Sequence, residues 1–321
     1  MSYRASIRKK NVNKVTIGLI WGFAFIVMDA LQYVYFGGLF QQLSSFLFGL
    51  LVFGSSSLAF IVWAWLKAPE QLRAAWSKPG NLVAVNLFAA LGLTAFMTSV
   101  QMIEPAVSYT VGAGVMPLTA WVLYRLGVPE GEAIRNKLEG LGNILIFVGI
   151  VFLTLITLGG LSGFVRGDFW VAVLGTGLAI ADGVFFTIML VYCQRLDRSG
   201  VGASLVFGIR MPLYILIAGA AVATGIGATG KELTTSALAV ALALGLAVTV
   251  PPMYALQKAV AAVSTMTISV LTALGPFLVF VLQIWEGRVD YSFVTLTGLF
   301  IYFVGAILGA SGAVKASVKN G

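Results

Sequence analysis

The chain has 321 residues, of which 59% are hydrophobic and only 10% are charged, with 20 Lys and Arg against 12 Asp and Glu. A soluble domain carries about 25% charged residues, so this composition excludes a pair of ordinary soluble domains. The chain has no histidine and one cysteine, Cys193. An intrachain disulfide is therefore excluded, and the commonest metal ligand and general base is missing.

Ten apolar stretches follow one another along the chain, each long enough to cross a bilayer. A helix needs about 20 apolar residues to span about 30 Å of hydrocarbon. The alternation typical of a membrane β-barrel is absent, so these stretches are predicted to be helices of an all-α membrane protein. The predicted spans are 15–37, 43–66, 80–100, 105–126, 138–158, 168–194, 203–226, 236–256, 260–285 and 291–312.

The basic residues are distributed unevenly between alternate loops. With the N-terminus in the cytoplasm, sixteen of the twenty Lys and Arg residues fall in inner segments, and only Arg166, Lys231 and Arg288 fall in outer ones. The positive-inside rule therefore predicts that both termini are cytoplasmic in a multi-pass membrane protein. The basic excess indicates orientation and anionic lipid contact rather than nucleic-acid binding.

The second half of the chain resembles the first. A shift of 153 residues places Gly22 on Gly175 and Asp29 on Asp182, and a shift of 156 places Gln101 on Gln257 and Gly142 on Gly298. Matches that run in order at a nearly constant offset favour a duplication over compositional coincidence. The predicted units are a basic segment at 1–14, repeats at 15–158 and 168–312, and a cytoplasmic tail at 313–321.

Each predicted repeat has five helices, so the two repeats are expected to cross the membrane in opposite directions. Inverted repeats are a recurring device of secondary transporters, with the substrate site near the bilayer midplane between the repeats. Because both repeats lie in one chain, a monomer is expected to suffice.

Two acidic residues, Asp29 and Asp182, are predicted to lie deep within the first and sixth spans, about 21 Å along their helices at 1.5 Å per residue. An acid at this depth costs on the order of 2.5–3.5 kcal/mol and should face a cavity or a partner. A substrate-ammonium site and a proton-coupling site remain alternatives, beside a structural acid capped by neighbouring Ser, Thr or Arg.

Arg210 is predicted to lie inside the seventh span, before Met211 and Pro212. Its guanidinium suits a substrate carboxylate. An ion pair with Asp182, or extension of the side chain towards the cytoplasm, is the structural alternative and is favoured on sequence grounds. Aspartate and arginine lining one cavity would together suit a zwitterion.

Aromatic and proline residues complete the candidate set. Trp21, Tyr33, Tyr109 and Tyr254 are candidates for the cavity lining. Prolines within spans remove a backbone hydrogen bond and favour kinks, so Pro117, Pro251, Pro252 and Pro276 are hinge candidates, with static shaping of the helices as the alternative. The consecutive pair Pro251–Pro252 predicts a broken helix.

The chain carries no phosphate-binding loop, no zinc-ligand spacing and no Ser/His pair. We therefore expect no enzymatic activity, cofactor or resident metal. The expected partners are a small-molecule substrate, the lipid bilayer and protons as an optional coupling ion, with no nucleic acid.

Several loose motifs recur in order in both halves. The pair Trp21–Gly22 lies in the first predicted span. Pro117 lies in the fourth span and Pro276 in the ninth. An acidic residue follows each of these two spans, Glu130 or Glu132 in the first half and Glu286 in the second. The next predicted helix in each half carries two glycines seven residues apart, Gly142 and Gly149 in the first half and Gly298 and Gly305 in the second. In this the chain resembles the ten-helix, EamA-like form of the drug/metabolite transporter superfamily, and most of all the bacterial exporters of aromatic and neutral amino acids. The proline-to-acid spacing differs between the halves, and Glu286–Gly287 reverses the order common in that family.

The resemblance implies a central cavity lined by helices one to four and six to nine, with helices five and ten at the periphery. It implies export of amino acids, other small metabolites or cationic drugs by alternating access. A proton-coupled cation exporter is the main rival, and a channel or a membrane enzyme is the rival from another class.

Overall fold

The computed structural model describes residues 2–39, 44–131, 133–162, 167–226, 235–286 and 292–320, and within these ranges it contains helices and no strands. The helices of the first half are α1 (Ser2–Leu39), α2 (Ser45–Lys67), α3 (Pro69–Trp76), α4 (Pro79–Met102), α5 (Pro105–Arg125) and α6 (Lys137–Leu158). Those of the second half are α7 (Phe169–Arg198), α8 (Ala203–Ile209), α9 (Pro212–Ala223), α10 (Thr235–Val260), α11 (Thr265–Thr272), α12 (Gly275–Glu286) and α13 (Phe293–Asn320).

Local sequence signals mark many helix ends. Asn136 and Asp168 accept hydrogen bonds from backbone amides in the first turns of α6 and α7, which satisfies donors that have no partner within the helix. Pro79 and Pro105 occupy first helical positions, where a missing N–H costs nothing. Glycines with positive φ follow four helices, as C-terminal caps often do: Gly127, Gly160, Gly200 and Gly225.

Nine segments of the described chain are long and apolar enough to cross a membrane, which defines a multi-pass membrane protein. They correspond to nine of the ten predicted spans, with α8 and α9 together forming one of them. The remaining predicted span, 260–285, is divided between the short helices α11 and α12, which separate before Gly275 and Pro276. The predicted all-helical membrane fold is confirmed at this level.

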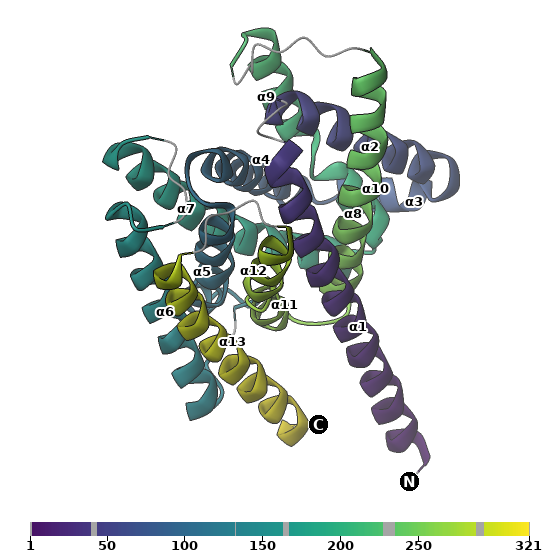
Figure 1. Ribbon diagram of the computed structural model, residues 1–321. Coiled ribbons are helices and arrows are strands. Elements are labelled where there is room, and N and C mark those ends of the chain that lie inside the picture. The colour runs from purple at the N-terminus through teal and green to yellow at the C-terminus, as the bar shows by residue number, and fades with distance from the viewer. Residues whose placement is uncertain are drawn as a thin grey trace.

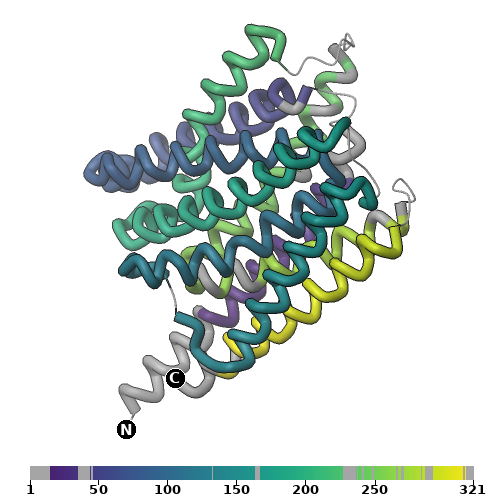
Figure 2. The backbone as a smooth tube through the Cα atoms, turned by 90° about the vertical axis from the view of Figure 1, so that its left-hand side faces the viewer, coloured from purple at the N-terminus to yellow at the C-terminus, as the bar shows by residue number. Residues whose placement is uncertain are grey.

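Helices from the two halves pack against each other. The extensive contacts include those of α6 with α13, α4 with α7, α1 with α10, α5 with α7 and α2 with α9. Figure 1 shows α6 and α13 side by side at one edge of the molecule, and Figure 2 shows them again as neighbouring teal and yellow tubes. The two sequence halves therefore share an extensive interface.

Small residues allow α6 and α13 to approach closely, with their backbones antiparallel. Four contacts follow one register: Gly142 with Gly309, Ile146 with Gly305, Gly149 with Tyr302, and Leu153 with Gly298. Glycine is needed here because a Cβ atom at position 149 would lie 2.9 Å from backbone atoms of Tyr302. Close backbone approach at small residues is the usual basis of helix association in membranes.

Candidate functional site

A cavity lies in the interior, among helices of both halves. Its empty space, including the part open to solvent, is about 810 Å³. Side chains from α1, α2, α4, α5, α7, α10 and α11 line it, together with the segment between α8 and α9. Five of the seven predicted binding or coupling residues are in this lining: Asp29, Tyr33, Tyr109, Asp182 and Arg210.

Asp29 of α1 is bound to a tyrosine of α5. The hydroxyl of Tyr109 donates a 2.8 Å hydrogen bond to Oδ2 of Asp29, whose side chain is 5% exposed. The Tyr109 ring lies 4.1 Å, centroid to centroid, from that of Tyr33, and its hydroxyl lies against Gly275. Asp29 is thus held in place by α5, with one oxygen already engaged.

Asp182 of α7 lies between two glycines of neighbouring helices. A Cβ atom at Gly112 of α5 would lie 3.1 Å from one carboxylate oxygen, and one at Gly92 of α4 would lie 3.6 Å from the other. Within the described residues, no hydrogen bond or ion pair engages the Asp182 carboxylate. Its carboxylate is therefore available to a molecule in the cavity.

Arg210 lies in the short segment between α8 and α9 and is 1% exposed. Its Nη2 atom donates to the sulfur of Met253 at 3.3 Å, and its guanidinium carbon lies 5.4 Å from the centre of the Phe207 ring. The Nε and Nη1 atoms have no hydrogen-bond partner. The ion pair with Asp182 that the sequence favoured is not formed, because no carboxylate of the described chain comes within 4.0 Å of this guanidinium.

Asn86 of α4, which the sequence reasoning missed, stabilises the interruption at Arg210. Its side-chain amide donates to the carbonyl of Ile209 at 2.6 Å and accepts from the amide of Leu213 at 3.3 Å. These bonds satisfy one backbone group on each side of the break. A polar asparagine within a predicted apolar span is the signal that could have found this role.

Most of the remaining lining is apolar. Phenylalanine and methionine dominate it, and methionine is a flexible residue that adapts to varied ligands. The polar exceptions that sequence reasoning missed are Gln32 and Thr272, each with a buried side-chain oxygen that has no hydrogen-bond partner. The aromatic and sulfur-containing members are Phe25, Phe53, Phe88, Phe96, Phe186, Met97, Met116, Met189, Met211 and Met253.

Two predicted candidates lie outside the cavity lining. Trp21 and Tyr254 pack edge to face, with ring centres 6.0 Å apart, and Lys258 places its ammonium 5.3 Å from the Tyr254 ring. They join α1 to α10. Packing is the more common fate of an aromatic residue in a span, and nothing in the sequence separated these two residues from those that line the cavity.

The predicted break at Pro251–Pro252 is wrong, because α10 runs without interruption from Thr235 to Val260. Proline φ is compatible with a helix, so two lost hydrogen bonds are tolerated where neighbouring helices support the segment. Pro117 likewise lies inside the continuous helix α5, whereas Pro276 lies in the first turn of α12. The breaks occur instead at Arg210–Met211 and at Ala273–Leu274.

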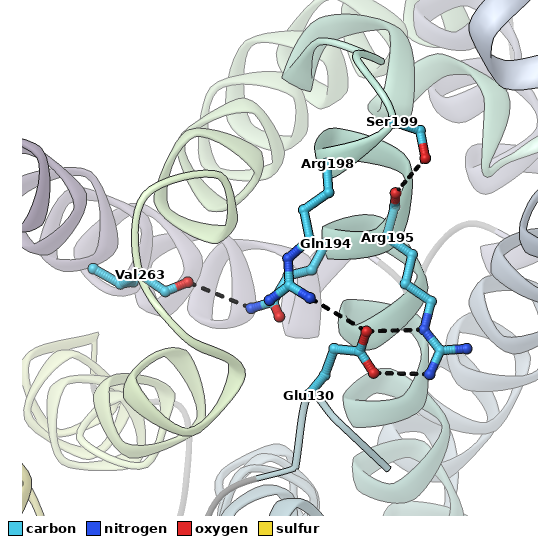
Figure 3. Close-up of polar contacts among 6 residues, drawn as sticks. All are labelled: Glu130, Gln194, Arg195, Arg198, Ser199 and Val263. Carbon is cyan, nitrogen blue, oxygen red and sulfur yellow. Dashed lines mark hydrogen bonds and ion pairs between the residues drawn. The ribbon is translucent and has the colours of Figure 1, made fainter.

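A second polar cluster joins the α5–α6 loop to the end of α7 (Figure 3). Glu130 accepts hydrogen bonds from Nε and Nη2 of Arg195 at 3.1 and 2.8 Å, and from Nη1 of Arg198 at 3.4 Å. The hydrogen bonds from Arg195 lower the pKa of Glu130 below its ordinary value. On the other side of α7, Gln194 donates to the carbonyl of Val263 at 3.4 Å.

Comparison with known proteins extends the description of the fold. No family model and no curated protein matches the sequence. A solved structure described only as "Crystal structure of protein" has a TM-score of 0.64 with this chain at 18% sequence identity, and the match covers 95% of this chain and 98% of that one. At this identity the similarity establishes a shared fold and carries no statement about function.

Proposed function

We propose that the chain is a secondary transporter of the drug/metabolite transporter superfamily that exports small metabolites across the bacterial inner membrane by alternating access. Amino acids are its proposed substrates. The observation that carries the proposal is the interior cavity, in which two carboxylates and one guanidinium are set among phenylalanine and methionine side chains. Charged groups inside membrane spans usually mark a substrate or ion pathway.

The packing of α6 against α13 supports the proposed inverted repeat. The sequence shift of 156 residues converts the contact of Gly142 with Gly309 into that of Gly298 with Leu153. It also converts the contact of Ile146 with Gly305 into that of Tyr302 with Gly149. Because these helices are antiparallel, such an exchange corresponds to a two-fold axis perpendicular to them, as an inverted repeat requires.

The contacts around the first helix of each half follow the same relation. Gly22 of α1 lies against Ala259 of α10 as well as Leu271 of α11, and Gly175 of α7 lies against Ile103, the residue that follows α4. The shifts of 153 and 156 residues exchange these two pairs. A similar pair of halves offers two conformations of similar energy, one open to each side of the membrane, which is the basis of the alternating-access proposal.

A proton-coupled exporter of cations is the second candidate. The observation that favours it is the excess of two carboxylates, Asp29 and Asp182, over one guanidinium in the cavity lining. Export of a neutral zwitterion down its concentration gradient needs no coupling ion, whereas cation export against a gradient does.

Flux into proteoliposomes tests both candidates. We expect saturable transport of one or more members of a panel of twenty amino acids, and a stimulation by a pH gradient only if protons are coupled. The double variant Asp29→Asn, Asp182→Asn should abolish transport of cationic drugs if the second candidate holds. Absence of transport across the whole panel would reject the amino-acid proposal, and an unsaturable current would indicate a channel.

A further inference from the structure

The guanidinium of Arg210 is a buried cation for which the described part of the chain provides no anion. Its side chain is 1% exposed, and two of its three nitrogen atoms, Nε and Nη1, have no hydrogen-bond partner. Among the described residues, no carboxylate lies within 4.0 Å of it. Removing a cation from water is costly unless an anion or several acceptors replace the water. A compensating negative charge is therefore expected beside Arg210.

The side chains that surround this guanidinium do not supply that charge. Nη2 donates to the sulfur of Met253 at 3.3 Å, and the guanidinium carbon lies 5.4 Å from the centre of the Phe207 ring. The thiol of Cys193 also lies within interaction range and accepts from Nε2 of Gln257 at 3.8 Å. Thioethers and thiols are weak acceptors, and a free thiol is mostly protonated at pH 7. The compensating anion therefore comes from outside the chain.

Arg210 is held in a fixed position at the wall of the cavity, beside a second source of positive potential. Asn86 binds the carbonyl of Ile209 and the amide of Leu213, on either side of Arg210. The twelve-residue helix α9 begins two residues further on, at Pro212. The positive end of its dipole lies close to the guanidinium and adds to the attraction for an anion.

The cavity lining limits the charge that this anion can carry. Arg210 is the only basic residue among the described residues of the lining, and the two acidic ones, Asp29 and Asp182, oppose the entry of negative charge. Met211 and Met253 make the wall beside Arg210 apolar. A divalent anion would leave one charge without a partner in these surroundings, which is costly. A monovalent anion matches the single guanidinium.

The need for permanent compensation favours an inorganic ion over a transported molecule. A carrier releases its substrate in every cycle, whereas the burial of Arg210 belongs to the fold itself. A counter-ion that left with the substrate would restore the full desolvation cost each time. Chloride is an abundant monovalent anion, and a spherical ion can accept from Nε or Nη1 without the paired oxygens that a carboxylate uses.

We infer that Arg210 and the start of α9 form a binding site for a small monovalent anion, chloride, which is the counter-ion of this arginine. The inference goes beyond the proposed transport function, because the ion is bound whatever molecule the cavity carries. It gives the buried guanidinium a resident partner that is independent of the substrate.

Equilibrium dialysis of the purified protein in detergent against radiolabelled chloride tests the inference directly. We expect a single saturable chloride site per chain in the wild type. Bromide and nitrate should displace the ion, whereas sulfate at the same ionic strength should not. A wild type that binds no chloride overturns the inference, and so does a wild type that binds acetate but not chloride.

Variants at position 210 locate the site. Arg210→Met removes the charge and keeps a side chain that suits the methionine-rich wall, so chloride binding should weaken roughly 10- to 100-fold. Arg210→Lys keeps the charge and should retain the site. Arg73→Met, at an exposed position in α3, is the matched control and should bind chloride as the wild type does. Equal binding by the wild type and Arg210→Met overturns the inference, and Arg210→Gln is a second uncharged variant if Arg210→Met does not fold.

The thiolate of Cys193 is the competing counter-ion, and Cys193→Ala tests it. We expect this variant to bind chloride as the wild type does. Chloride binding that appears only in Cys193→Ala would identify the thiolate as the partner of Arg210 and overturn the inference.

The counter-ion site and the transport proposal fail in different ways. A protein that binds chloride at Arg210 but moves no substrate across proteoliposomes contradicts the transport proposal alone. A protein that transports amino acids but binds no chloride contradicts the counter-ion site alone.

Discussion

At the scale of single residues, the two intramembrane acids have different surroundings, although the proposed repeat would make them equivalent. Asp29 is held by the Tyr109 hydroxyl, whereas Asp182 lies beside the two glycines Gly92 and Gly112. The first arrangement satisfies an oxygen within the protein, and the second leaves a carboxylate for a ligand. Two residues that the proposed repeat makes equivalent therefore need not have the same role.

The hydroxyl of Tyr109 can be removed without changing the shape of the ring. Tyr109→Phe should lower the free energy of unfolding by about 1–3 kcal/mol, because it leaves a buried carboxylate oxygen without its donor. Unfolding in mixed micelles measures this. Tyr33→Phe is the matched control, since among the described residues its hydroxyl has no hydrogen bond, and it should change stability by less than about 0.5 kcal/mol. An equal effect of the two variants would contradict the role given to the hydrogen bond.

At the scale of helices, the interruptions follow from the neighbours rather than from proline alone. Pro251 and Pro252 lie in an unbroken helix. The chain breaks instead before Pro212, where Asn86 supplies partners for backbone groups on both sides. A break within a membrane requires such replacement partners, since lipid provides none.

The contact between the α5–α6 loop and α7 should be sensitive to acid. The pKa of Glu130 is lowered below its ordinary value of 4.5, mainly by hydrogen bonds from Arg195. Its charged form therefore contributes stability above about pH 4.5, and this contribution is lost as the pH falls through the folded-state pKa. Glu130→Gln should destabilise the protein by about 0.5–1 kcal/mol at pH 7, a small value because Arg198 is largely exposed to water.

Unfolding temperatures of wild type and Glu130→Gln measured from pH 3 to pH 8 check this prediction. The difference between the two proteins should be constant above about pH 5 and should shrink towards zero in acid. Glu70→Gln, at an exposed position in α3, provides the control. A difference independent of pH would show that the charge of Glu130 does not stabilise this contact.

At the scale of the whole molecule, the α6–α13 interface joins the last long helix of each half. Gly149→Ala places a methyl group 2.9 Å from backbone atoms of Tyr302, so the helices must separate. The expected loss is about 1–3 kcal/mol in the free energy of unfolding, as for other overpacked sites. Gly177→Ala, where the added methyl group meets no atom within 4 Å, should leave stability unchanged or raise it by up to about 1 kcal/mol. Equal stability of the two variants would exclude close packing as the basis of this interface.

Much of the fold was predictable from the sequence, because membrane insertion depends on local quantities. An apolar run of about 20 residues forms a helix in lipid whatever its neighbours do, since its backbone groups have no other partners. The nine spanning segments and the cap residues are of this kind. The division of the segment 260–285 between α11 and α12 could not be predicted in this way, because it depends on what packs around residues 273–276.

The candidate site was predictable only in part. Charged residues in apolar spans stand out in the sequence, so Asp29, Asp182 and Arg210 were candidates, and all three line the cavity. Trp21 and Tyr254 were not distinguished from true lining residues, because an aromatic side chain packs equally well against a helix or a ligand.

The sequence by itself determined the class of protein, its spanning segments and the charges buried within them, because hydrophobic burial and the cost of a charge in lipid are properties of the residues themselves. Only the tertiary structure decided that Asp29 is engaged by Tyr109, that Asp182 and Arg210 do not pair with each other, and that Asn86 supports the break beside Arg210. Each of these is a distance of a few ångströms between residues far apart in the chain. Such distances depend on how the helices pack, and no local property of the residues specifies them.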